Sequence, residues 1–125
     1  MKIVHGETTT TKDNAKSGAP LRELLVIRPR GSLTGISAAE RLRQSLARTF
    51  ETGNVAVVLD LSEITHLDNA GLRAIAWTFE QARGNGDLVV CGARDTVASL
   101  FRLTRLDRRV RMFATAEEAC KAIAS

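Results

Sequence analysis

The residues best suited to binding or regulation lie in one stretch of this sequence, between Asp60 and Leu72. Asp68 stands just ahead of a helical pattern, where its side chain can accept hydrogen bonds from the free N–H groups of the first turn. The start of a helix also carries positive potential, which favours a carboxylate or a phosphate. A hydroxyl in that turn would be a phosphorylation switch, because the added phosphate would repel Asp68 and change the surface that a partner meets.

Residues suited to catalysis or metal binding are not grouped in the same way. The two histidines, His5 and His66, are not near a nucleophile motif, and no spacing of Cys or His is typical of a metal site. The short Gly31–Gly35 segment is small and polar, but the chain has no phosphate-binding motif with its lysine. We therefore predict that the protein is not an enzyme and needs no metal or cofactor. We interpret His66 as a loop residue, with a partner contact beside Asp68 as the alternative.

Two elements are expected to position Asp68, a buried strand before it and an amphipathic helix after it. Residues 55–61 form an apolar run broken only by Asp60, which is typical of a strand buried on both faces. Residues 62–68 are polar and are expected to form a loop. The helix that follows has apolar residues at i, i+3, i+4 and i+7, namely Leu72, Ile75, Ala76 and Phe79.

This stretch resembles the signature of STAS domains. Asp60-Leu61-Ser62, then Ile64, then Leu67-Asp68-Asn69-Ala70-Gly71-Leu72 match that signature in type and spacing. Such domains occur in bacterial anti-sigma factor antagonists and in the cytoplasmic tails of sulfate transporters, and the resemblance covers the chain from about Leu24 to its end. One position departs from the pattern. Phosphorylated members carry Ser or Thr just before the glycine, where this chain has Ala70.

The resemblance implies a regulatory protein-binding module, an anti-sigma factor antagonist that binds a kinase-type anti-sigma factor through residues 68–72. Ala70 has no oxygen to accept a phosphoryl group, and Asn69 cannot be phosphorylated by a serine kinase. The domain is then either a permanently unphosphorylated binder, which we favour, or it is controlled through Ser62 or Thr65. The alternative function is a STAS subunit of an ABC-type lipid transport complex that contacts its ATPase through much the same surface.

The expected partner-binding surface adds a second segment to this helix start. In the family, the loop at Ser32 to Thr34 lies beside the helix start and often supplies an Asp, a position that Thr34 takes here. The plainer alternative for that loop is a turn into a capped helix. Gly71 near a helix start costs up to about 1 kcal/mol relative to Ala, which indicates a close backbone approach to a strand or a partner. The predicted partner-binding residues are Ser32, Thr34, His66, Asp68, Asn69, Ala70, Gly71, Leu72 and Arg73.

The order of the predicted elements indicates one α/β domain. Residues 1–7 are expected to form a short strand and residues 8–20 a loosely held loop, so that residues 1–20 precede a domain of residues 21–125. Residues 21–28, 55–61, 87–91 and 110–113 also have strand patterns, and the strand at residues 1–7 would pair antiparallel with the strand at residues 21–28. The resemblance adds that the sheet is small and mixed, with four or five strands and about four helices.

Three helix starts are also predicted from capping signals. Ser37 to Glu40 and Thr115 to Glu118 have the spacing of capping boxes, in which the hydroxyl accepts from the third helical N–H. Asp95 is expected to cap another helix, whose inward face carries Val97, Leu100 and Phe101. Trp77 lies about 140° from Leu72 on the helical wheel. It either shields a flank of the core or anchors an interface.

The chain is basic, with a formal net charge of +4 and a pI of about 9.7. No aromatic ladder or helix-turn-helix pattern accompanies the late arginines, so we predict no nucleic-acid partner. We interpret them as a solvated basic face, with an acidic protein partner as the alternative. These arginines are Arg102, Arg105, Arg108, Arg109 and Arg111.

No apolar run approaches the roughly 20 residues that span a bilayer, and the N-terminus does not resemble a signal peptide. Cys91 and Cys120 are interpreted as reduced core residues, because both fall on apolar patterns. We therefore expect a cytoplasmic protein without direct membrane insertion. The sequence leaves open whether it forms a homodimer.

Overall fold

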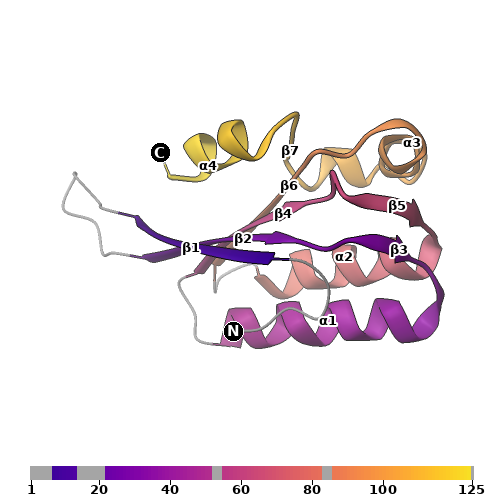
Figure 1. Cartoon of the computed structure of the whole chain (residues 1–125), viewed down its shortest axis with the longest axis horizontal. Helices are drawn as coiled ribbons and strands as arrows, with labels where there is room; N and C mark the ends of the chain where they lie inside the picture. The colour runs from indigo at the N-terminus through magenta and orange to yellow at the C-terminus, as the bar shows by residue number, and fades with distance from the viewer. Residues whose placement is uncertain (1–6, 14–21, 52–54, 83–85, 125) are drawn as a thin grey trace.

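A five-stranded mixed sheet in the order β1-β2-β4-β6-β7 forms the centre of the protein (Figure 1). The structure is a computed structural model that describes residues 7–13, 22–51, 55–82 and 86–124. β1 pairs antiparallel with β2 and the other neighbours are parallel, which confirms the mixed sheet and the α/β fold class, although the antiparallel partner of β2 is residues 7–13 instead of the predicted 1–7. The strands are β1 (Glu7–Asp13), β2 (Arg22–Arg28), β4 (Val55–Asp60), β6 (Gly86–Cys91) and β7 (Met112–Phe113).

Both faces of the sheet are covered, which explains the unbroken apolar runs in its strands. On one face, Val55, Val57 and Leu59 share a core cluster with residues of α1 and α2; on the other, Ala56 and Val58 pack with α4 (Figure 1). β2, β4 and β6 are added in one direction, and right-handed crossovers then place the two helices that connect them on one face. The helices are α1 (Gly35–Glu51), α2 (Asn69–Ala82), α3 (Asp95–Leu103) and α4 (Ala116–Ala124), with a short 3-10 helix, η1 (Leu106–Arg108).

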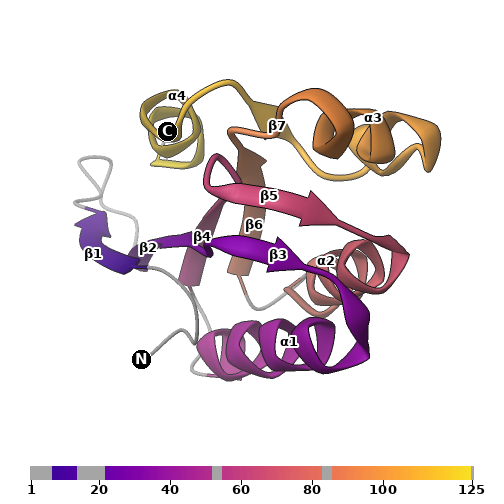
Figure 2. The same ribbon diagram turned by 45° about the vertical axis from the view of Figure 1, so that its right-hand side comes forward.

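A second, two-stranded sheet lies beyond the carboxyl ends of β2 and β4. β3 (Gly31–Leu33) pairs in parallel with β5 (Ile64–Leu67), and each strand leads into the start of a helix, α1 or α2 (Figure 2). The prediction of loops at Ser32 to Thr34 and over residues 62–68 was wrong where these two strands form. Both strands are short and largely exposed on one face, so neither has the apolar pattern of a strand when viewed alone.

The remaining boundaries confirm some predictions and correct others. Glu118 N–H donates to Thr115 Oγ1 (3.1 Å), which confirms the predicted cap of α4. α1 begins at Gly35, two residues before the predicted cap Ser37, which therefore lies inside the helix. Asp95 is the first residue of α3 rather than its cap, a position that Arg94 holds without a side-chain hydrogen bond.

The N-terminal strand also differs from the prediction. β1 includes the threonine run that was expected to be a loop, because its backbone pairs with β2 from Glu7↔Arg28 to Asp13↔Arg22. The threonines are β-branched and suit a strand at the edge of a sheet. Residues 1–6 and 14–21, which carry the rest of the N-terminal prediction, lie outside the described residues.

Gly71 allows α2 to lie directly against the small sheet. A Cβ at this position would be 2.6 Å from Leu67 Cδ1 and 2.7 Å from the backbone oxygen of Leu33. Both distances are shorter than real carbon contacts, and the second involves backbone that cannot rotate away. The glycine is therefore explained by close approach to a neighbouring strand, one of the two alternatives left open by the sequence.

Gly71→Ala is expected to lower the free energy of unfolding by about 1–3 kcal/mol, because the added methyl group forces α2 away from β3. Urea denaturation followed by circular dichroism measures this. Asn69→Ala, an exposed neighbour in the same turn, is the control and should change stability by less than about 0.5 kcal/mol. Equal stability of Gly71→Ala and the unchanged protein would contradict the tight contact.

Candidate functional site

The side chain of Asp68 joins the starts of two helices. Its Oδ1 accepts a hydrogen bond from Gly71 N–H in the first turn of α2 (3.0 Å), which confirms the predicted cap. Its Oδ2 accepts from Gly35 N–H at the start of α1 (2.8 Å), 33 residues earlier in the chain. One carboxylate therefore satisfies a free N–H of each helix and lies at the positive end of both helix dipoles. The expectation that the segment around Thr34 lies beside the start of α2 is confirmed by this contact.

These backbone donors affect the acid–base behaviour of Asp68. The N–H of Gly35, followed by that of Gly71, holds the pKa of the Asp68 carboxyl below its usual range. Asp68 is therefore ionised at neutral pH, and its charge is directed into the two helix starts. Asp68 fixes the geometry of the turn.

The other predicted contact residues divide into exposed and buried groups. Ser32 and His66 are exposed and face each other in register across β3 and β5. Ser32 Oγ is hydrogen bonded to Thr34 Oγ1 (2.8 Å), and His66 Nδ1 lies 3.1 Å from Thr65 Oγ1. Asn69 and Arg73 are exposed on α2, Ala70 is half-buried, and Gly71 and Leu72 are buried. The structure thus places all nine at one end of the molecule, on three adjacent elements and the residues between them.

Ile36 belongs to the same surface and was missed by the sequence analysis. It is 83% exposed, although it is a large apolar residue, and it follows Gly35, which is hydrogen bonded to Asp68. Isolated exposed apolar residues are common, but this one lies beside the turn that the family motif marks. The only sequence signal for Ile36 is its position next to Ser37. The capping box at Ser37 predicts a helix that begins after Ile36, whereas α1 begins at Gly35.

A second carboxylate, Asp60, holds the carboxyl end of β4. Burial alone would raise the pKa of Asp60, but hydrogen bonds from Ser62 N–H (2.9 Å) and Arg28 Nε (2.9 Å) outweigh it and lower the pKa. Burial, with the nearby charge of Asp60, raises the pKa of Cys91 to about 12, so this free cysteine stays a thiol. Asp60 thus forms a structural ion pair with Arg28 at the buried end of β4. The apolar run of β4 gave no indication of its partner on β2.

The two alternative phosphorylation positions lie in different environments. Ser62 is half-buried, its N–H is hydrogen bonded to Asp60, and its carbonyl accepts from Arg94 (3.3 Å). Thr65 is exposed on β5. A kinase would therefore reach Thr65 more readily than Ser62, while Ala70 in the first turn of α2 carries no hydroxyl.

Trp77 lies at the surface against a neighbouring helix, and its predicted role as an interface anchor stays a prediction. It is 38% exposed on α2, and the Arg43 guanidinium of α1 lies over its ring, 4.7 Å from the ring centre. Cation–π contacts of this kind join the two helices at the surface. Trp77 thus covers the junction between α1 and α2.

Comparison with known proteins identifies the family. A family model described as the STAS domain matches residues 14–119. The chain belongs to the STAS domain family. BtrV of Bordetella bronchiseptica, described as an anti-sigma factor antagonist, is 34% identical over 67 residues, which are 53% of this chain and 58% of that protein. This chain thus matches just over half of the length of that curated relative.

Solved STAS structures share the fold. An anti-sigma factor antagonist from Mycobacterium paratuberculosis is 22% identical and superposes with a TM-score of 0.75, covering 95% of this chain and 96% of the other. SpoIIAA in its unphosphorylated form is 19% identical, with a TM-score of 0.69 and coverage of 92% and 96%. Among the described residues of this STAS domain, no helix combines the length and hydrophobicity needed to cross a bilayer.

Asp68→Asn tests whether the Asp68 carboxylate holds the starts of α1 and α2 together. The amide keeps only one acceptor oxygen and turns a donor toward the second N–H, so the melting temperature at pH 7 should fall by a few degrees. The native pKa of Asp68 is lowered, so its contribution is fully present above the unfolded pKa of about 4 and is lost as the pH falls through the native pKa. The difference between the two proteins should therefore narrow in acid.

Thermal unfolding between pH 7 and pH 2.5, followed by circular dichroism, measures this difference. Glu63→Gln is the control, because it removes one negative charge from an exposed side chain close by in the sequence. A melting temperature of Asp68→Asn that equals that of the control at every pH would show that Asp68 does not hold the helices.

Proposed function

We propose that this STAS domain is an anti-sigma factor antagonist that binds a kinase-type anti-sigma factor and so releases a sigma factor. The mechanism is competition for one protein surface, and this chain makes or breaks no bond. The observation that carries the proposal is the pair of helix starts held on Asp68. It presents an exposed apolar side chain, Ile36, together with exposed polar groups at Asn69 and Ser32.

This arrangement suits protein recognition. A surface that exposes a large apolar residue together with polar groups has the composition of a protein interface. Because Asp68 and Gly71 hold the turn rigidly, little conformational entropy is lost when a partner binds. The family relationship and the anti-sigma factor antagonists among the similar proteins support the class of partner.

We further propose that binding is not switched off by phosphorylation of the α2 turn. Ala70 occupies the position at which the phosphorylated members of the family carry a hydroxyl. A methyl group there cannot accept a phosphoryl group, and Asn69 beside it is not a substrate for a serine kinase. The domain then remains a competent binder whenever the partner is present.

Ile36→Asp should weaken binding of the partner by at least about tenfold, because a charge replaces the apolar side chain at the centre of the surface. Affinity purification from the source cell, with mass spectrometry of the retained proteins, identifies the partner; titration calorimetry with the purified partner then measures affinity. Gln81→Glu adds the same charge at the exposed far end of α2 and is the control.

The identity of the captured protein separates the two functions implied by the family. A kinase-like anti-sigma factor that is lost with Ile36→Asp and kept with Gln81→Glu supports the proposal. Capture of an ABC-type ATPase in its place would replace the sigma-factor mechanism with the lipid-transport alternative. A kinase-like partner that binds Ile36→Asp normally would refute the proposed surface.

Ala70→Ser should convert the protein into a phosphorylation-controlled binder. With the purified partner and ATP, the serine variant is expected to gain about 80 Da, the mass of one phosphate, and to dissociate, because the phosphate repels Asp68. The unchanged protein should gain no phosphate and stay bound. Intact-mass spectrometry and size-exclusion chromatography provide the two measurements. A phosphate on Thr65 or Ser62 of the unchanged protein would show that control has moved to that residue.

A further inference from the structure

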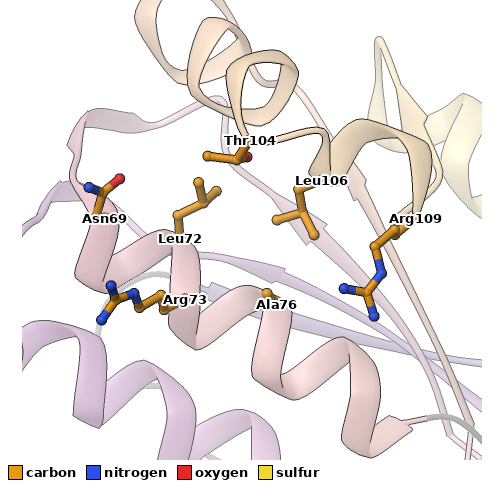
Figure 3. A pocket seen from close by; sticks show the side chains of 7 residues that line it. All are labelled: Asn69, Leu72, Arg73, Ala76, Thr104, Leu106 and Arg109. Atoms are coloured by element: carbon orange, nitrogen blue, oxygen red, sulfur yellow. The ribbon is translucent and has the colours of Figure 1, made fainter.

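A groove runs between α2 and the segment from Thr104 to Arg109, beside the Asp68 turn. It encloses about 360 Å³, a volume at the lower end of the range for small-ligand pockets. Figure 3 shows Leu72 of α2 and Leu106 of η1 pointing into its middle, with Ala76 beneath. Both leucines are only 5% exposed, so they form the apolar floor of the groove.

An arginine lies at each end of this groove, and one of the two is neutralised by an ion pair. Figure 3 shows Arg73 beside Asn69 at one end and Arg109 at the other. Arg109 forms an ion pair with Glu80, whereas no ion pair or hydrogen bond of Arg73 occurs among the described residues. Three further exposed arginines lie close by in the sequence, against a single exposed acid, Asp107; they are Arg102, Arg105 and Arg108.

We propose that this groove, lined by α2 and the 104–109 segment, binds an acidic, partly apolar peptide segment of the partner protein. The apolar side chains of such a segment would contact Leu72 and Leu106, and its carboxylates would lie near Arg73 and the exposed arginines. The inference rests on the proposed function, because it names the chemistry of the partner segment that continues from the Asp68 turn along α2. It also assigns a role to the arginines near the groove, which take no part in the proposed contact at the Asp68 turn.

The spacing of the charges favours a peptide over a small anion. A phosphate or sulfate site needs donors that converge on one point, whereas Arg73 and Arg109 lie at opposite ends of an apolar floor. A nucleic acid would need aromatic platforms or a continuous basic track, and the side chains that line the groove include no aromatic residue. Alternating charge and apolar contact is the chemistry of an amphipathic segment that fills a groove.

A fluorescein-labelled synthetic peptide of glutamate and leucine tests the groove directly. It should bind the unchanged protein in fluorescence anisotropy, and two matched peptides should not, one with lysine for glutamate and one with serine for leucine. Methyl NMR shifts should fall on Leu72, Ala76 and Leu106. Arg73→Glu should weaken binding by about tenfold, since it turns a positive charge, one that has no ion-pair partner among the described residues, into a negative one.

Two further variants make the test specific to the groove. Ala76→Met fills the apolar floor with no change of charge and should also weaken binding about tenfold. Arg48→Glu makes the same charge change as Arg73→Glu at an exposed position in the last turn of α1 and should have less than about a twofold effect. Thermal unfolding of each variant verifies that it is folded.

The inference is overturned if the serine-containing peptide binds equally well, if Arg48→Glu weakens binding as much as Arg73→Glu, or if the methyl shifts lie elsewhere. The natural partner separates this result from the proposed function. A partner whose binding is lost with Ile36→Asp but unaffected by Ala76→Met supports the Asp68 surface and refutes the groove. A peptide that occupies the groove when no anti-sigma factor binds supports the groove and refutes the proposed function.

Discussion

The structure depends on one carboxylate that serves two helices. The Asp68 carboxylate accepts hydrogen bonds from the Gly71 N–H of α2 and the Gly35 N–H of α1, so that the first turns of the two helices lie beside each other. Helix starts carry unsatisfied donors and positive potential, and a single anion between them compensates both. The small sheet of β3 and β5 brings the two starts together, and the missing side chain at Gly71 allows α2 to lie against it.

The second aspartate of the family motif has a parallel role in the sheet. Asp60 is buried at the end of β4, where Arg28 from β2 and the Ser62 N–H satisfy it. A buried charge is tolerated only when it is paired and hydrogen bonded, and this pair fixes the chain as it leaves the main sheet for the small one. Both motif aspartates therefore act as hydrogen-bond acceptors in the scaffold, and neither requires a catalytic role.

The surface that these aspartates shape has two neighbouring parts. At the helix starts, the apolar Ile36 and short polar side chains are exposed. Along α2, the groove lies between arginines, with Leu72 and Leu106 at its centre. Leu72 is one turn from Asp68, so a single partner segment could extend from one part to the other. The main sheet, covered on both faces, supplies a rigid base for both.

Local patterns are enough to predict the fold class, the buried strands, the second long helix and the cap at Asp68, because each has a pattern of sufficient length or a capping residue beside it. The tertiary structure creates the small sheet, since β3 and β5 become strands by pairing with each other across more than thirty residues. It also decided the partners of the two aspartates, Gly35 and Arg28, and the exposure of Ile36. Contacts between distant segments depend on how the crossovers place them, and no local periodicity records that placement.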